Sequence, residues 1–218
     1  MQRILEPEVM DSWEEAVEYD AMDFTAVNAA FAQRAIELGL PQAKVLDAGV
    51  GTARIPILIC QQCPQWQITA IDLAKNMLAI GSQNVQQAGL QAQIVLQYAD
   101  AKQLPYADGY FDMAISNSLI HHLPDPLTFL VELKRVLKPN GAILIRDLMR
   151  PATEEIVNTF VDSIGSEYSD RQKQLFRDSL HAAFTLDEVE QLILSAGLSN
   201  VKIYQSSDRH WTVERAGL

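Results

Sequence analysis

The sequence predicts an open α/β fold built on a mostly parallel sheet, and three observations predict it. Short apolar segments alternate with amphipathic helical segments between residues 43 and 148, as in parallel strands joined by right-handed crossovers. The first apolar segment runs directly into a loop with two glycines, Gly49 and Gly51. After Pro151 the pattern changes to helical segments followed by a short hairpin. We therefore expect seven strands, five of them in the alternating region and two in a closing antiparallel hairpin.

Apolar spacing and end signals place each element. Strands are expected over residues 44–47, 67–72, 94–96, 111–116, 142–145, 201–204 and 211–213. Helices are expected over residues 24–38, 52–60, 74–88, 125–137, 154–164, 170–180 and 185–196. Asp125 followed by Pro126 is typical of a helix start, and Ser169 with Gln172 forms a capping box. Residues 1–23 carry little pattern.

Composition narrows the class of protein. The chain has 218 residues, which is enough for one substantial core, so a single domain is expected. A formal net charge of −11 disfavours a large nucleic-acid surface, because contacts with phosphates need a basic patch. No apolar run approaches the roughly 20 residues that span a bilayer, and the acidic start does not resemble a signal peptide. We therefore expect a cytoplasmic protein. Cys60 and Cys63 form a lone C-x-x-C pair, interpreted as ordinary packing or surface cysteines.

The glycine loop indicates nucleotide binding, because backbone N–H groups at a strand–loop–helix junction face the edge of the sheet. A dinucleotide fingerprint needs a third glycine, which is missing after Gly51. Asp72 ends the second strand and suits a ribose diol in either cofactor class. Asp100 follows the third strand, where a carboxylate can accept the amino group of an adenine.

Five segments, in order, resemble those of the class I S-adenosylmethionine-dependent methyltransferases, in particular the small-molecule branch similar to the ubiquinone and menaquinone biosynthesis enzymes. The segments are Val45–Thr52, Ile71–Leu78, Asp100–Pro105, Phe111–Leu123 and Leu137–Gly141. The resemblance covers roughly Ala43 to Leu148. One departure is Ala53, where members of the family often have glycine.

The resemblance implies a fold and a division of the chain. The expected fold is a Rossmann-like, seven-stranded, mostly parallel sheet with helices on both faces, a terminal antiparallel hairpin strand and a helical lid. Residues 1–218 are expected to form one methyltransferase domain. Its expected parts are an N-terminal cap (1–40), a cofactor-binding half (41–150), a helical lid insertion (151–184), and a closing helix with the hairpin (185–218).

The resemblance also implies S-adenosylmethionine as the cofactor, S-adenosylhomocysteine as its product, and a small-molecule methyl acceptor. Asp47 is expected to orient the loop and favour the ammonium group, and Asn117 to face the methionine part. The expected cofactor-binding residues are Asp47, Gly49, Gly51, Thr52, Asp72, Leu73, Met77, Asp100, Ala101 and Asn117. Structural interpretations remain open for four of these residues: Asp47 and Asp72 as helix caps, Asp100 as a turn cap, and Met77 as core.

His121 and His122 follow the fourth strand, where the transferred methyl group would point, and are the candidate catalytic bases. The alternative is that each histidine only packs or contacts the cofactor. No metal site is expected, because neighbours in sequence rarely point into one site. Substrate-pocket candidates are Tyr19, Met22, Arg209 and Trp211.

Two other functional hypotheses stay open at this point. One is a protein that binds S-adenosylmethionine as a sensor or partner subunit without transferring the methyl group. The other is a nicotinamide-dependent oxidoreductase, which the missing third glycine and the closing hairpin disfavour. The sequence leaves open the acceptor, its reacting atom and the oligomeric state.

Overall fold

A single seven-stranded sheet organises the computed structural model, which describes residues 1–7, 9, 11–166 and 168–218. The strand order is β3-β2-β1-β4-β5-β7-β6. Strands β1 to β5 pair in parallel, whereas β7 pairs antiparallel with both β5 and β6. The predicted fold class, with its closing hairpin, is therefore confirmed.

The strands are β1 (Ala43–Ala48), β2 (Trp66–Asp72), β3 (Ile94–Tyr98), β4 (Phe111–Asn117), β5 (Leu137–Leu148), β6 (Lys202–Gln205) and β7 (His210–Arg215). The helices are α1 (Trp13–Asp20), α2 (Thr25–Leu38), α3 (Arg54–Cys60), α4 (Lys75–Ala88), α5 (Pro126–Val136), α6 (Glu154–Ser163), α7 (Asp170–Ala182) and α8 (Leu186–Ala196). A single 3-10 turn, η1, covers Ile120–His122.

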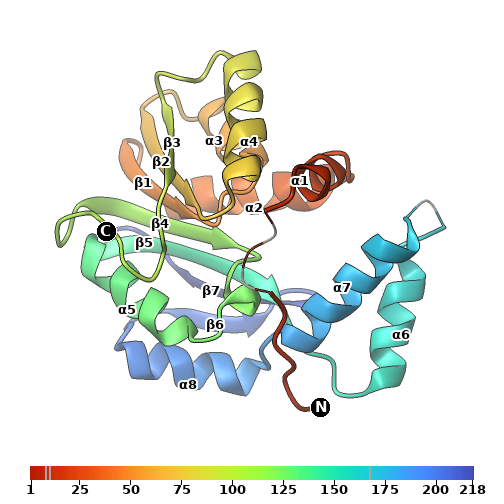
Figure 1. The fold of residues 1–218 in the computed structure, drawn as a ribbon. Helices are drawn as coiled ribbons and strands as arrows, with labels where there is room; N and C mark the ends of the chain where they lie inside the picture. Colours follow the sequence, from red (N-terminus) through yellow and green to blue (C-terminus); the bar gives the residue numbers. More distant parts are fainter. Residues whose placement is uncertain (8, 10, 167) are drawn as a thin grey trace.

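Helices cover both faces of the sheet (Figure 1). On one face, α2 and α3 bury Phe31 and Ile59 in a core that includes Trp66. On the other, α5 and α8 bury Phe129 and Ile193. The strands between these layers are buried on both sides, which explains their near-continuous apolar sequence.

The parallel pairing brings several strand ends to one edge. The carboxyl end of β1 lies beside that of β2, where Ala48 pairs with Ile71. The end of β4 lies beside β5, where Asn117 pairs with Arg146. In open α/β sheets ligands bind outside the carboxyl ends of the strands, so this edge positions the candidate site.

Two expectations about local structure are wrong. Residues 13–20, for which no element was predicted, form helix α1, capped by a box in which Ser12 and Glu15 exchange hydrogen bonds. The fifth strand, expected over residues 142–145, begins earlier, at Leu137 of β5, and has irregular pairing with β4 between Phe111 and Met113. Asn140 there has φ of 62°, a conformation that Asn tolerates.

Two segments flank the carboxyl edge of the sheet. Helices α6 and α7 pack against each other, and α7 contacts η1. The start of the chain is held beside them, because Arg3 donates hydrogen bonds to the carbonyls of His121, Leu123 and Ala182. The Arg3 guanidinium also lies 3.9 Å from the centre of the Phe184 ring.

Cys60 is buried in the core and Cys63 is half-buried, and both are free thiols. Burial, followed by the neighbouring Cys63, raises the pKa of Cys60 to about 12, which makes it unreactive near neutral pH. Within the described ranges, no helix is both long and apolar enough to cross a membrane.

Candidate functional site

The glycine loop after β1 is held in a conformation that favours glycine at both positions. Gly49 and Gly51 have φ of 78° and 55°. A Cβ on Gly49 would lie 3.0 Å from Leu119 Cβ, so a side chain has little room there. The N–H groups of Gly49 and Val50 donate to the carbonyl of Ile71, which ties the loop to the end of β2.

Ala53 follows this loop and also has a positive φ, of 64°. A left-handed conformation costs an alanine roughly 1–2 kcal/mol relative to its preferred regions. The positive φ explains why members of the family often have glycine at this position. Ala53 adopts the same left-handed conformation at the N-cap of α3 at that energetic cost.

Asp72 joins the loop to the end of β2. Its Oδ2 accepts a hydrogen bond from Gly51 N and its Oδ1 accepts one from Ala74 N, each at 2.8 Å. Each carboxylate oxygen keeps acceptor capacity for a ligand. Burial raises the pKa of Asp72, and the backbone N–H groups oppose that shift. Asp72 therefore ties the loop to the end of β2, and the orienting role expected of Asp47 stays a prediction.

Asp47 lies in the sheet behind the loop and is only 4% exposed. Its Oδ2 has no hydrogen-bond partner among the described residues. Burial, followed by the charge of Asp72, raises the pKa of Asp47 to about 8. The Asp47 carboxyl is therefore mostly protonated at neutral pH and acts as a neutral group.

A cavity of about 480 Å³ opens at this edge of the sheet. It is lined by most of the residues predicted to bind the cofactor: Gly49, Gly51, Asp72, Leu73, Met77, Asp100, Ala101 and Asn117. Asp47 and Thr52 are not in its wall; Thr52 is buried, and its carbonyl accepts a hydrogen bond from Asn84. Asp100 Oδ1 also accepts a hydrogen bond from Lys102 N at 2.8 Å, so it caps a turn as well.

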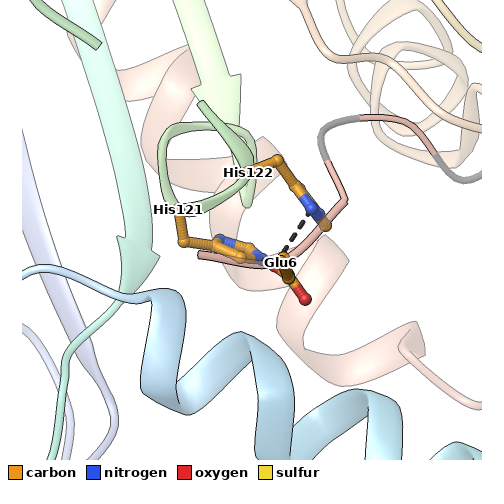
Figure 2. A group of neighbouring side chains, drawn as sticks. All are labelled: Glu6, His121 and His122. Atoms are coloured by element: carbon orange, nitrogen blue, oxygen red, sulfur yellow. Dashed lines mark ion pairs between the residues drawn. The ribbon is translucent and has the colours of Figure 1, made fainter. Parts of the chain in front are cut away.

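The two histidines of η1 line the same cavity and converge on Glu6 (Figure 2). Glu6 Oε1 lies 3.0 Å from His122 Nδ1 and 3.5 Å from His121 Nε2. The ring centres of His121 and His122 are 4.1 Å apart. The expectation that neighbouring histidines would point away from one another is therefore wrong at this position.

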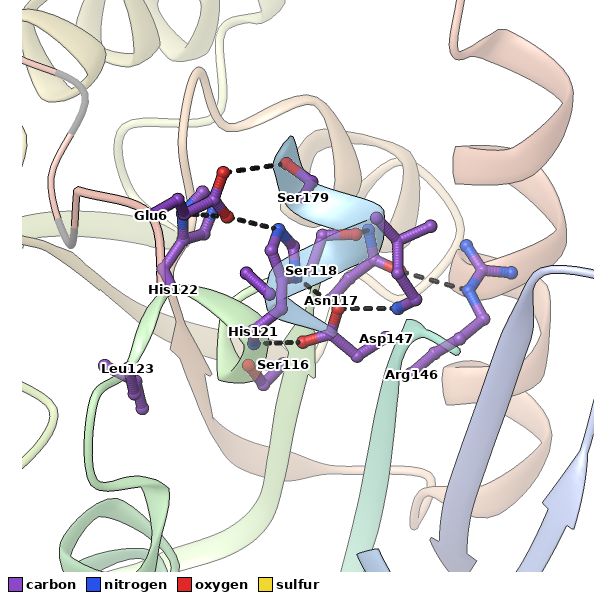
Figure 3. A network of polar contacts seen from close by, with 12 residues as sticks. Glu6, Ser116, Asn117, Ser118, His121, His122, Leu123, Arg146, Asp147 and Ser179 are labelled. Atoms are coloured by element: carbon purple, nitrogen blue, oxygen red, sulfur yellow. Dashed lines mark hydrogen bonds and ion pairs between the residues drawn. The ribbon is translucent and has the colours of Figure 1, made fainter. Parts of the chain in front are cut away.

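Asp147, from the end of β5, holds the buried ring of His121 (Figure 3). His121 Nδ1 lies 2.5 Å from Asp147 Oδ1, and the backbone N–H of His121 donates to Oδ2 at 3.1 Å. A carboxylate only accepts, so Nδ1 carries the proton and Nε2 faces Glu6. Burial is the largest influence and lowers the pKa of His121, but the charge and hydrogen bond of Asp147 together with the charge of Glu6 outweigh it, and the net shift is upward.

Three of the four predicted substrate-pocket residues line the cavity: Tyr19, Met22 and Arg209. Burial, followed by the charge of Asp72, raises the pKa of Tyr19 to about 12. The Arg209 guanidinium lies 5.2 Å and 5.9 Å from the ring centres of Phe160 and Phe176. The fourth residue, Trp211, is a correction: it is 1% exposed and packs in the core beside α5 and α8.

Sequence reasoning missed several residues of the site. Arg146 and Asp147 end the apolar run of β5, and charged residues at the end of a buried strand were a usable signal. Arg146 lines the cavity and donates to Asn117 Oδ1 at 3.1 Å. Glu6 carried no such signal, because only the tertiary fold brings residue 6 beside residues 121 and 122.

Comparisons with known proteins identify relatives. Residues 46–145 match the family described as a methyltransferase domain. The chain is 30% identical over 174 residues to a demethylmenaquinone methyltransferase of Bacillus velezensis, covering 74% of this chain and 73% of that protein. It is 27% identical over 197 residues to a malonyl-[acyl-carrier protein] O-methyltransferase of Geobacter sulfurreducens, covering 88% and 70%. A crystal structure of an S-adenosylmethionine-dependent methyltransferase from Aquifex aeolicus has the same fold, with a TM-score of 0.70, 18% identity, and coverage of 96% and 100%.

Proposed function

The chain belongs to the class I S-adenosylmethionine-dependent methyltransferases, and we propose that its methyl donor and acceptor meet in the cavity at the carboxyl edge of the sheet. The protein is an enzyme related to the quinone biosynthesis methyltransferases, and nothing in the comparisons favours a non-catalytic binding protein. The observation that supports the proposed site is that the glycine loop, Asp72 and the histidines of η1 line one continuous cavity.

S-adenosylmethionine, when bound, supplies an electrophilic methyl group on a positively charged sulfur. The residues that line the cavity fit this group. Glu18 contributes a buried carboxylate oxygen, Oε2, that has no hydrogen-bond partner among the described residues. A cationic ligand would offset the cost of burying that oxygen. Gly49 and Gly51 line the cavity without side chains of their own, so a ligand there meets their backbone directly.

We assign the cofactor contacts from this placement. Asp72 would bind the ribose hydroxyls with the acceptor capacity that the loop leaves free. Leu73 and Met77 would flank the adenine, and Asp100 with Ala101 would read its edge. Asn117 would face the methionine part. Asp47 does not line the cavity, so its effect on the loop and on the cofactor would be indirect.

On the acceptor side, His121 and His122 would act on the reacting group, with Tyr19, Met22 and Arg209 shaping the pocket. Residues 1–40 and 151–184 would act as cap and lid, because both supply cavity wall, including Met22 and Phe176. The names of the relatives concern acceptors as different as demethylmenaquinone and a carrier-bound malonyl group, so they leave the acceptor atom open. The net charge of −11 favours a small molecule over a nucleic acid. Two free cysteine thiols accord with a cytoplasmic enzyme.

Calorimetry with S-adenosylmethionine, S-adenosylhomocysteine and NAD tests the site, and we expect binding of the first two only. Tighter binding of NAD would refute the assignment of the cavity. Turnover is tested by screening small molecules for acceptor-dependent production of S-adenosylhomocysteine. His181 lies outside the cavity wall and provides the control substitution, His181→Gln, which should leave cofactor binding unchanged.

A further inference from the structure

Three atoms that commonly ligate metals converge beside the cavity. They are Glu6 Oε1, His121 Nε2 and His122 Nδ1, and all lie within 4.8 Å of one another. The side chains of Glu6 and His121 are 7% and 4% exposed, and that of His122 is 18% exposed. Figure 2 shows the two rings and the carboxylate facing a common point.

Ion pairs join Glu6 to both histidines, but hydrogen bonds of good geometry do not complete the cluster. His121 Nδ1–H donates a hydrogen bond to Asp147, so Nε2 presents either a lone pair or a second proton to Glu6. Glu6 Oε1 and His122 Nδ1 form an ion pair at 3.0 Å, but neither buried atom has a hydrogen bond of good geometry among the described residues. Buried polar atoms are rarely left this way unless something else is bound.

We infer that Glu6, His121 and His122 form a binding site for one divalent transition-metal ion. Two imidazole nitrogens and a carboxylate oxygen are a donor set that suits Zn²⁺ and its neighbours and does not suit Mg²⁺. Ligands about 2.0–2.1 Å from a tetrahedral ion lie about 3.3 Å from one another. The two separations from Glu6 Oε1, 3.0 Å and 3.5 Å, bracket that value, and the two histidine nitrogens lie within 4.8 Å of each other.

The surroundings resemble the outer partners of known metal sites. Asp147 fixes the tautomer and the orientation of His121, as carboxylates do for histidines that bind zinc. Ser179 donates to the other oxygen of Glu6, at 3.1 Å, which leaves Oε1 to face the histidines. Arg3 anchors the segment that carries Glu6 through the carbonyls of His121 and Leu123 (Figure 3 shows the cluster).

Metal binding by these three residues is independent of the proposed function. The effect of the metal on the choice of methyl acceptor rests on that function. His121 and His122 line the cavity, so an ion held by them would have a coordination position facing it. Such a position selects an acceptor with a hydroxyl or carboxylate oxygen, since zinc binds oxygen and makes a bound hydroxyl more acidic. The histidines would then be ligands and not free bases.

The experiment uses the full chain, purified without a polyhistidine tag and stripped with a chelator. Zn²⁺ is titrated in competition with a chromophoric chelator, and Co²⁺ is added separately to read coordination from its visible spectrum. We expect one equivalent of Zn²⁺. Glu6→Gln and His122→Ala should each weaken binding about 100-fold or more, since even loss of an outer partner costs roughly 10–100-fold.

Two control variants separate this site from adventitious binding. His181→Gln removes a histidine that pairs with Glu154 outside the cavity wall, and Cys63→Ser removes one thiol of the C-x-x-C pair. Both should keep the zinc affinity of the parent protein, and circular dichroism should show every variant folded. Absence of stoichiometric binding, or equal losses in the control variants, would overturn the metal site. If the zinc-free protein methylates an acceptor at the full rate, the role given to the ion in acceptor activation is refuted, while zinc binding is decided by the titration and the proposed function stands.

Discussion

Asp147 contacts His121 twice, through the ring Nδ1 at 2.5 Å and through the backbone N–H at 3.1 Å. The two contacts link the end of β5 to η1 and set which ring nitrogen of His121 faces Glu6. Because Asp147 is 1% exposed and does not line the cavity, its effect on a ligand is carried through the histidine.

Asp147→Asn should therefore weaken zinc binding about 10–100-fold, the range seen when the outer partner of a ligating histidine is lost. Affinity for S-adenosylmethionine should stay within about twofold, since Asp147 is not in the cavity wall. The measurement is a pair of titrations, one with each ligand. Asp112→Asn, at a carboxylate that pairs with Lys138, is the matched control. Equal zinc affinity in both variants and the parent would contradict the role given to Asp147.

Asp72→Ala should lower the affinity for S-adenosylmethionine at least tenfold, about 1.4 kcal/mol. The carboxylate is the proposed ribose contact, and it also holds Gly51 N and Ala74 N. Calorimetry measures the loss, and Asp72→Asn keeps one acceptor oxygen for Gly51 N while it removes the charge and the second acceptor, at Ala74 N.

Asp125→Ala serves as the control for Asp72. It removes an N-cap from α5, away from the cavity wall, and should cost about 1 kcal/mol of stability with no change in cofactor affinity. Unchanged affinity in Asp72→Ala would reject the ribose assignment.

The strands and the loop were predictable because their signals are local. The signal lies within about 30 residues, since it consists of one strand, two glycines and an acid at the end of the next strand. The geometry of the loop and of the bound nucleotide requires these residue types. Helix α1 was missed although Ser12 and Glu15 form a capping box, since the acidic segment lacks the apolar spacing that predicts helices. The closing hairpin was predicted. Trp211 was assigned to the substrate pocket although its side chain is buried in the core, because successive side chains of a strand point to opposite faces of the sheet.

The cluster around His121 was predictable only in part. The two histidines stand out in the sequence after β4, at the edge where ligands bind. Glu6 lies 115 positions before His121 in the sequence, and Asp147 lies 26 positions after it. Only the packing of the folded chain brings these residues together. The stereochemical argument against a shared site for neighbouring residues fails because η1 turns tightly and places both rings toward Glu6.

Asp47 gives the free energy of unfolding a pH dependence of known sign. Its pKa is about 8 in the folded protein against an ordinary value of 3.8, so between these values the folded state binds the extra proton. Stability from this group is therefore greatest at low pH and falls as the pH rises through that window, at a slope of about 1.4 kcal/mol per pH unit. Asp47→Asn should remove the slope.

Urea unfolding of the parent protein and of Asp47→Asn, at several pH values between 5 and 9, measures the difference curve. The comparison isolates Asp47 because every other titrating group is common to both proteins. The stability of the variant relative to the parent should grow by about 1.4 kcal/mol per pH unit up to about pH 8 and level off above it, where the folded parent also ionises. Parallel pH curves would show that Asp47 is ionised in the folded state.

Trp211 and Arg209 are two residues apart on the hairpin but should behave differently when truncated. Trp211→Ala should cost about 3–5 kcal/mol of stability, because its fully buried ring packs among α5, α8 and the sheet. Arg209→Ala should change stability much less, since its side chain lies at the cavity wall over Phe160 and Phe176, and should instead raise the KM for the acceptor. Denaturant unfolding of both variants, with acceptor kinetics where Trp211→Ala remains folded, distinguishes the two. A Trp211→Ala protein of near-normal stability with a raised KM would return Trp211 to the pocket, as the sequence had predicted.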